Sequence, residues 1–239
     1  MNILFFSIST RSMTTSTKQS YERNDMKSES NNQSKTLLPE PTLRRLPWYL
    51  AYVSQLRRSG VETVSSTQIA KEICVDASQI AKDLSFVAIR GKTRIGYDVA
   101  ELEKQLSDFL GFKQTHKAFM IGAGSLGGAL IQDRGLMQYG LNIVAGFDID
   151  EKVVGKTING VPIFHFDEIK RQQALYGAKI AVLAVPVECA QQVTNRVIEA
   201  GLKAIWNFTP YRIKPNKEIV VQNTSIYAHL ALMYNRMRE

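Results

Sequence analysis

Cysteine and histidine are scarce in this sequence. The 239 residues include two cysteines and three histidines, and Cys74 and Cys189 lie far apart, outside any CxxC pair. This spacing argues against a disulfide scaffold and against a structural zinc site, so we expect no bound metal and a reducing, cytoplasmic setting. Long apolar runs are also missing. None approaches the roughly 20 residues that span a bilayer, so we expect no membrane partner.

Concentrated charge of one sign is missing too. The net charge is +8, but residues 1–36 contribute +2, residues 37–112 contribute +1 and residues 113–239 contribute +5. Bulk charge alone therefore identifies no nucleic-acid-binding segment, and the placement of individual Arg and Lys residues has to decide.

Residues 1–36 lack the aliphatic side chains that a core requires. After a short apolar start (MNILFFSIS) the segment is polar and rich in Ser, Thr and Asn. Such a composition buries too little apolar surface to offset the entropy of ordering. We predict a disordered N-terminal extension over residues 1–36, with a degenerate targeting signal as the alternative. We also hypothesise that synthesis starts at Met13 or Met26.

What the sequence does contain is a glycine-rich turn between two apolar runs. The first run ends at Ile121, a helix-like segment follows the turn, and the second run ends at Asp148. Strand, glycine turn, helix, strand and acid is the order of a dinucleotide-binding βαβ unit. The turn consists of Gly122, Ala123, Gly124, Ser125, Leu126 and Gly127. A purely structural glycine turn is the alternative.

Each residue of this motif has an expected task. Gly122 permits the tight turn, Gly124 lets the backbone approach a pyrophosphate, and Gly127 lets the helix pack closely on the strand. The first amides of the helix would face the phosphates. Asp148 would accept hydrogen bonds from an adenosine ribose.

The segment 37–112 predicts a helical domain. Apolar residues recur at helical spacing from Leu43 to Leu56, with Thr42 as a possible N-cap and Arg44 and Arg45 on the other face. This helix should end at Ser59-Gly60. Two short helices follow, one capped by Ser65 or Ser66 and running through Ile73, the other capped by Asp76 and covering residues 77–84. Their inward residues would be Ile69, Ala70, Ile73, Val75, Ile80 and Leu84, which is a helix-turn-helix pattern.

A basic, glycine-containing stretch comes next. Residues 90–97 (RGKTRIGY) combine three cations with two glycines, before a helix that starts near Asp98. This pattern is typical of the wing of a winged helix, whose tip reaches a minor groove. A solvated basic turn is the alternative. The residues that we expect to contact DNA are Ser78, Gln79 and Lys82 on the second helix and Arg90, Lys92 and Arg94 in the wing.

The remaining pattern continues a parallel α/β fold. Residues 179–186 and 204–210 predict strands, with a helix over residues 188–200 between them. Because ligands lie beyond the carboxyl ends of parallel strands, Val185, Pro186 and Asn207 are expected near a nicotinamide, with ordinary strand-end packing as the alternative. Residues 227–238 predict a last helix with Leu230, Met233 and Met237 on one face.

Several separated motifs together resemble the Rex redox-sensing transcriptional repressors. They are PEPTLRRLPWYLAYVSQLRRSGVETVSSTQIAKE, DASQIAKDLSF, GYDV, IGAGSLGGAL, FDID and NFTP, and they cover essentially residues 38–238. The resemblance implies an α/β protein with a winged helix-turn-helix domain (37–112), a Rossmann NAD(H)-binding domain (113–222) and an exchanged dimerisation helix (223–239). It also implies a homodimer that binds inverted-repeat operator DNA and releases it when NADH replaces NAD+.

The sequence departs from the family pattern at two places. Ala81 stands where the family usually has an Arg, so the operator is expected to differ. An acidic residue that the family uses in an inter-domain switch is replaced around Thr224-Ser225. The candidates for a redox switch in this chain are Arg44, Arg45, Tyr97 and Ser225.

Two other functions remain open at this point. One is a regulator whose pocket takes another nucleotide, such as coenzyme A. The other is a small NAD-dependent oxidoreductase, which would need a general acid or base beside the nicotinamide. None of His116, His165 and His229 stands in a recognisable acid–base group. We therefore name no catalytic residue and expect the protein not to be an enzyme.

Overall fold

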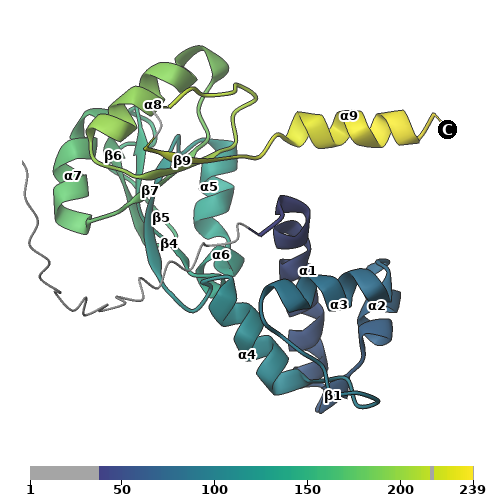
Figure 1. Cartoon of the computed structure of the whole chain (residues 1–239). Coiled ribbons are helices and arrows are strands. Elements are labelled where there is room, and N and C mark those ends of the chain that lie inside the picture. Colours follow the sequence, from purple (N-terminus) through teal and green to yellow (C-terminus); the bar gives the residue numbers. More distant parts are fainter. Residues whose placement is uncertain (1–37, 216–217, 239) are drawn as a thin grey trace, which may run out of the picture. The chain divides into compact units, whose positions relative to one another are not determined.

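The computed structural model describes residues 38–215 and 218–238 (Figure 1). The buried apolar side chains of these residues form separate cores in the N-terminal and C-terminal parts. The expected N-terminal extension, over residues 1–36, lies outside the described residues. No helix in the described ranges is long and apolar enough to cross a membrane.

The N-terminal part is a winged helix-turn-helix, as predicted. Its elements are α1 (Glu40–Arg58), β1 (Thr63–Val64), α2 (Ser66–Ile73), α3 (Ala77–Phe86), β2 (Tyr97–Asp98) and α4 (Val99–Phe109). Strands β1 and β2 pair antiparallel. The inward residues expected for the two short helices all lie in or against one core, which α1 closes with Leu46, Leu50 and Val53.

The helix ends explain why these segments fold locally. The Ser65 hydroxyl oxygen accepts the amide hydrogen of Gln68, and Oε1 of Gln68 accepts the amide hydrogen of Ser65. A full capping box therefore starts α2. Asp98 caps α4 by accepting the amide hydrogen of Glu101. Two expected caps were wrong. Helix α1 begins at Glu40, which leaves Thr42 inside it, and Asp76 precedes α3 without a side-chain capping bond.

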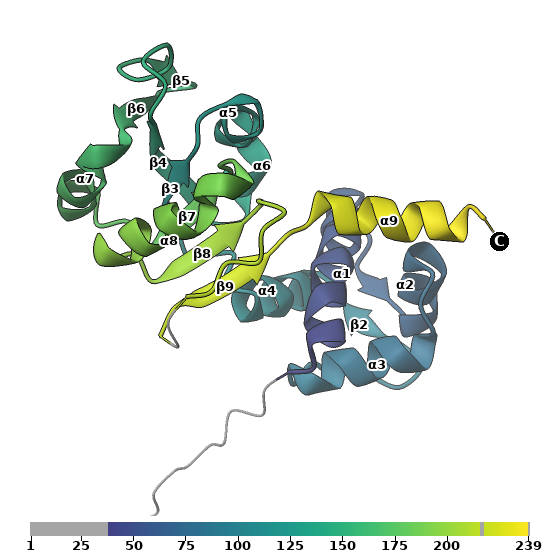
Figure 2. The same ribbon diagram turned by 90° about the horizontal axis from the view of Figure 1, so that it is seen from above.

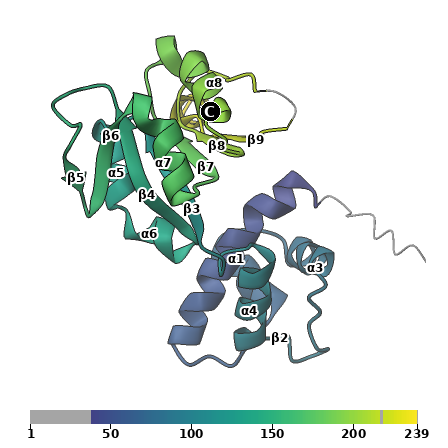
Figure 3. The ribbon, with the colours of Figure 1, turned by 90° about the vertical axis from the view of Figure 1, so that its left-hand side faces the viewer.

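The C-terminal part is a Rossmann sheet, as predicted. Its elements are β3 (His116–Ile121), α5 (Ser125–Gln132), α6 (Arg134–Gln138), β4 (Leu141–Asp148), β5 (Thr157–Ile158), β6 (Val161–His165), α7 (Ile169–Tyr176), β7 (Ile180–Leu183), α8 (Ala190–Glu199), β8 (Ala204–Asn207) and β9 (Val220–Asn223). The strand order is β5-β6-β4-β3-β7-β8-β9, and every pair is parallel except β5 with β6, at the edge visible in Figure 3. The crevice of this topology lies where the order reverses, between β3 and β7.

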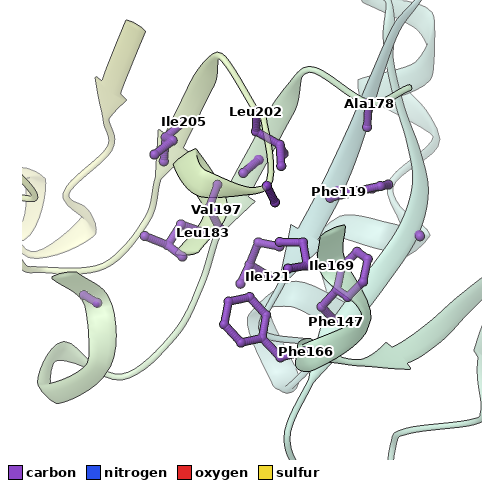
Figure 4. Packing of buried hydrophobic residues seen from close by; sticks show 14 of the residues in the cluster. Phe119, Ile121, Phe147, Phe166, Ile169, Ala178, Leu183, Val197, Leu202 and Ile205 are labelled. Carbon is purple, nitrogen blue, oxygen red and sulfur yellow. The ribbon is translucent and has the colours of Figure 1, made fainter. Parts of the chain in front are cut away.

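Helices cover both faces of the sheet, with α5 and α6 on one side and α7 and α8 on the other (Figure 2). Strand β3 serves both cores because its side chains alternate. Phe119 and Ile121 join the cluster of α7 and α8 shown in Figure 4, whereas Ala118 and Met120 join the cluster that includes Ile131 of α5. The central strands are therefore buried on both faces, which explains their continuous apolar runs.

The predicted last helix is α9 (Ile226–Arg236). Ser225 caps it by accepting the Ala228 amide hydrogen at 3.1 Å. Within the described residues α9 has no buried side chain, and Leu232, Met233 and Met237 are exposed.

Candidate functional site

The glycine turn joins β3 to α5 with almost no spare space. Gly122 has a φ of +91°, and a Cβ there would collide with the carbonyl oxygen of Ala184. A Cβ on Gly127 would collide with the carbonyl oxygen of Gly122. The tight turn expected at Gly122 and the close packing expected at Gly127 are therefore both present, and each excludes a side chain for a different reason.

Gly124 differs from its neighbours because no atom lies within 4 Å of where its Cβ would be. It is the N-cap of α5, and it is exposed together with Ser125 and Leu126. A helix N-terminus with an open glycine in front of it offers backbone amides and room to an anion. This open space is what a pyrophosphate requires and what a side chain would fill.

Asp148, at the end of β4, is hydrogen-bonded to the glycine turn. Its Oδ2 accepts the amide hydrogen of Ala123 at 2.7 Å, and its Oδ1 accepts those of Ile149 and Asp150 at 2.7 and 3.0 Å. The carboxylate is half-buried at the rim of the cleft described below. It therefore fixes the turn and still has lone pairs for a ribose hydroxyl.

A cleft of about 670 Å³ opens between the carboxyl ends of the strands and α8. Its lining is Ile121, Gly122, Gly124, Phe147, Asp148, Ile149, Asp150, Val153, Phe166, Ala184, Val185, Pro186, Cys189, Gln192, Val193 and Arg196. Val185 and Pro186 line it, and their expected contact with a nicotinamide stays a prediction. This apolar cleft with a few polar groups, at the strand ends, has the character of a nucleotide site.

Sequence reasoning missed the wall that α8 supplies. Arg196 lies 4.5 Å above the ring of Phe166, and its Nη2 is 2.6 Å from Oδ1 of Asp167. Positions 189, 192, 193 and 196 are spaced as one face of a helix, and all of them line the cleft. That periodic face, directly after a strand end, is the signal that could have found Arg196.

Asn207 lies outside the cleft lining. Its side chain is buried, donates to the carbonyl oxygen of Tyr211 at 2.8 Å and to Oδ1 of Asn223 at 2.9 Å, and accepts two bonds from Thr209. These bonds connect the end of β8 to β9. A contact between Asn207 and a nicotinamide stays a prediction.

On the N-terminal part, the residues expected to contact DNA are nearly all exposed. Ser78 and Lys82 lie on the outer face of α3, and Gln79 is half-exposed. In the wing, Lys92 and Gly96 exchange two backbone hydrogen bonds of 2.7 and 2.9 Å. This tight loop holds Arg94 at a φ of +67° and leaves the three wing cations, Arg90, Lys92 and Arg94, exposed.

The strongest polar cluster of the helical part surrounds Asp83, which sequence reasoning passed over. Asp83 is fully buried and accepts two hydrogen bonds from Arg45, at 2.6 and 2.9 Å. Tyr49 and Thr42, also on α1, donate at 2.6 and 2.9 Å, and Gln79 donates from α3 at 2.7 Å. The expectation that Arg45 lies on the outer face of α1 was wrong, because its guanidinium faces α3.

The Asp83 cluster carries a charge despite its burial. Burial by itself would raise the pKa of Asp83, but the hydrogen bonds from Arg45, Tyr49, Thr42 and Gln79 outweigh it and lower the pKa to about 2. Burial, and then the bond to Asp83, raise the pKa of the Tyr49 phenol. The cluster is therefore an ionised carboxylate held by one cation and three neutral donors.

The other switch candidates have separate surroundings. Arg44 is exposed and pairs with Glu40 at 2.7 Å, one helical turn away. Tyr97 is buried in the winged-helix core, and burial raises its pKa. Ser225 is occupied as the cap of α9. Among the described residues, no group of three or more His, Cys, Asp or Glu side chains is placed to hold a metal.

Two family models match the chain. One, described as a putative DNA-binding protein N-terminus, matches residues 38–85, and the other, a CoA binding domain, matches residues 113–211. A redox-sensing transcriptional repressor Rex from Bacteroides fragilis is 56% identical over 212 residues, which is 89% of this chain and 96% of the relative. A Rex from Porphyromonas gingivalis is 53% identical, over 85% of this chain and 93% of the relative.

The chain belongs to the Rex family of redox-sensing transcriptional repressors. Two solved structures agree with this assignment. The Rex-family repressor RSP in complex with β-NAD+ and operator DNA has a TM-score of 0.80 to this chain, with 31% identity over 84% of this chain and 93% of RSP. RSP in complex with β-NADH has a TM-score of 0.76 at the same identity and covers 84% of this chain and 95% of RSP. These Rex relatives are repressors, so the oxidoreductase alternative is not supported.

Proposed function

We propose that this protein is a DNA-binding transcriptional repressor that senses the NADH/NAD+ ratio and releases its operator when NADH binds. The observation that carries this proposal is the likeness, across both parts of the chain, to RSP bound to β-NAD+ and operator DNA. The winged helix, the glycine turn and the open cleft are all present in one chain. We further propose a cytoplasmic location, where two free cysteines stay reduced.

We propose that the cleft beside Asp148 binds NAD(H) through its adenosine and pyrophosphate. Support comes from the open space in front of Gly124, the N-terminus of α5 and the carboxylate at the cleft rim. When bound, the cofactor supplies a nicotinamide whose oxidation state is the signal. The protein binds and orients it without catalysing its turnover. The proposed contacts are Gly122, Ala123, Gly124, Ser125, Leu126, Gly127, Asp148, Val185, Pro186 and Asn207.

We propose that α3 enters a major groove and the wing follows an adjacent groove of an inverted repeat. The exposed side chains of Ser78 and Lys82 support the first contact, and the exposed wing cations support the second. The protein would bind as a homodimer through α9, because that helix exposes Leu232 and Met233 and is followed by the exposed Met237. We also propose the domain boundaries expected from the sequence, and the separate cores on either side of residue 112 support the first of them.

Of the two arginines that are candidates for the redox switch, we propose Arg44 rather than Arg45. Arg45 already donates two hydrogen bonds to Asp83, whereas Arg44 makes only an exposed pair with Glu40. Tyr97 and Ser225 stay candidate partners.

Coenzyme A is a second candidate ligand, because a CoA binding domain model matches residues 113–211. The Asp148 carboxylate disfavours it, since a 3′-phosphate on the adenosine would lie near a like charge. The test is operator binding with NAD+, NADH, NADP(H) and coenzyme A in parallel, at one salt concentration. We expect NADH alone to release the DNA. Release by coenzyme A would move the assignment to the second candidate, and no response to any nucleotide would contradict both.

A further inference from the structure

Gln79, near the start of α3, has a side-chain amide whose orientation is set by a buried carboxylate. Its Nε2 donates to Oδ1 of Asp83 at 2.7 Å. A carboxylate only accepts hydrogen bonds, so the opposite amide orientation would place two acceptors against each other. The amide is therefore held with its nitrogen toward Asp83.

Asp83 itself cannot turn to accommodate another orientation of Gln79. Three donors from α1 hold its two oxygens: Thr42, Arg45 and Tyr49, at 2.6 to 2.9 Å. These residues lie on one face of α1, at positions i, i+3 and i+7. Helix α1 thus fixes the position of the carboxylate. The single hydrogen bond from Gln79 to this carboxylate then fixes the orientation of the Gln79 amide.

Gln79 is also accessible. It is the third residue of α3 and half-exposed, and it lines a shallow open groove together with Thr67 and Lys71 of α2. The first residues of a recognition helix are the ones that contact base edges in helix-turn-helix proteins. Two other polar side chains of α3 offer less. The Ser85 hydroxyl donates to the Lys82 carbonyl of its own helix, and Lys82 is a flexible donor with no acceptor.

With one N–H given to Asp83, the Gln79 amide retains one N–H donor and the Oε1 acceptor. In the major groove adenine presents an acceptor, N7, beside a donor, N6–H, and this pair matches the retained groups. Guanine presents two acceptors and thymine an acceptor with a methyl group, so neither satisfies Oε1 and the N–H together.

We propose that Gln79 reads one adenine in each half of the operator and that Asp83 is the positioning residue that orients its amide. This inference rests on the proposed DNA-binding function and deepens it, because it names the base that one residue selects. The α1 donors to Asp83 contribute indirectly, because they hold the carboxylate that orients the Gln79 amide.

The first experiment uses the full chain with NAD+ and selects binding sites from a duplex library with randomised half-sites. The preferred site is then remade with 7-deazaadenine, which lacks N7, at one adenine at a time. We expect the wild-type protein to lose affinity on the order of tenfold at one symmetric adenine pair. Gln79→Met keeps the length of the side chain without the amide, and it should bind the natural and 7-deaza sites equally.

Matched variants separate base reading from a structural role. Gln105→Met removes another glutamine that donates to a carboxylate one helical turn away, Glu101 at the start of α4, and it should retain the wild-type preference. Asp83→Asn lets the Gln79 amide turn and should weaken the preference at the same position. If Asp83→Asn does not fold, as a thermal melt would show, the Gln79→Met comparison decides.

The outcomes distinguish the two proposals. A wild-type protein that selects an operator but binds every 7-deaza site normally overturns the reading of adenine and leaves the repressor function intact. The same holds if Gln79→Met keeps the adenine preference and only weakens binding to all sequences. A wild-type protein that selects no DNA sequence overturns both.

Discussion

Arg45 on α1 and Asp83 on α3 form a two-bonded ion pair between residues 38 positions apart, with N–O distances of 2.6 and 2.9 Å. The carboxylate is fully buried, and about a fifth of the Arg45 side chain is exposed. Burying a charge is unfavourable unless it is paired and hydrogen-bonded, so each partner offsets the desolvation cost of the other. The pair also links the first helix to the helix that we propose enters DNA.

Removing Arg45 should therefore be costly. Arg45→Ala leaves the buried carboxylate with neutral donors only, and we expect a loss of about 3 kcal/mol in the free energy of unfolding. Arg44→Ala is the matched control, because its pair with Glu40 is exposed, and it should cost about 0.5 kcal/mol or less. Urea unfolding followed by circular dichroism measures both. Equal effects would show that the buried pair contributes nothing special.

Stability should fall in acid through Asp83. Its pKa in the folded chain is about 2, against an ordinary value of 3.8. Because the folded value is the lower one, the stabilisation is fully present above about pH 4 and is lost as the pH falls toward 2. Melting temperatures measured from pH 5 to pH 2 should drop less steeply for Asp83→Asn, which starts lower. The control Asp76→Asn, at the exposed start of the same helix, should follow the wild type.

Gly124 in the glycine turn and Gly128 in α5 should respond differently to added side chains. Gly124→Val projects into the open space of the cleft and should abolish NADH binding without a loss of stability. In Gly128→Ala the new methyl group meets its nearest atoms at 3.7 and 3.9 Å, so it should bind NADH normally. Titration calorimetry and a thermal melt on each variant test this. Unaltered NADH affinity in Gly124→Val would contradict the assignment of the phosphate site.

The wing cations should contribute mainly through phosphate charge. Replacing Arg90 and Arg94 with Ala should weaken operator binding and flatten its dependence on salt, by about 0.9 in the log–log slope for each phosphate that the wing no longer neutralises. Lys170 and Arg171, exposed on α7, give a control pair of the same charge change. A wild-type slope in the wing variant would mean that these side chains do not contact phosphates.

Ala88 offers a test of backbone strain beside the recognition helix. Its φ is +60°, a conformation that disfavours any residue with a Cβ. Ala88→Gly should therefore stabilise the protein by about 0.5–1 kcal/mol, after the extra freedom of glycine in the unfolded chain is offset. Ala81→Gly, inside α3, should instead destabilise by about 1 kcal/mol. The same substitution then gives opposite signs in one unfolding experiment, and equal signs would contradict the strain.

The features that the sequence predicted correctly are those whose causes are local. The turn at Gly122, the close packing at Gly127 and the cap at Ser65 each depend on residues a few positions away. Continuous apolar runs likewise indicated the buried parallel strands.

The features that were missed depend on distant partners. Thr42 looked like a cap and Arg45 like an outer-face cation, because their common acceptor, Asp83, lies 41 and 38 residues later. Arg196 was missed for the same reason. Its position depends on Phe166, which lies 30 residues earlier in the sequence and contacts it only in the folded chain. The bonds from Asn207 to Tyr211 and Asn223 were also missed, because they follow from a strand pairing that the motif NFTP does not encode.

The bond between Asp148 and the Ala123 amide has a consequence for how the repressor sets its threshold. It joins the carboxylate that we propose binds the ribose to the turn that we propose binds the phosphates, so little ordering is needed when a dinucleotide arrives. In the proposed site this unit contacts the ADP half, which is chemically the same in both redox forms. The unit therefore adds the same binding free energy for NAD+ and for NADH. A contribution that is equal for both ligands does not change the ratio of their affinities. Mutations at Asp148 should therefore change the total dinucleotide concentration at which the protein responds and leave the redox midpoint where it was.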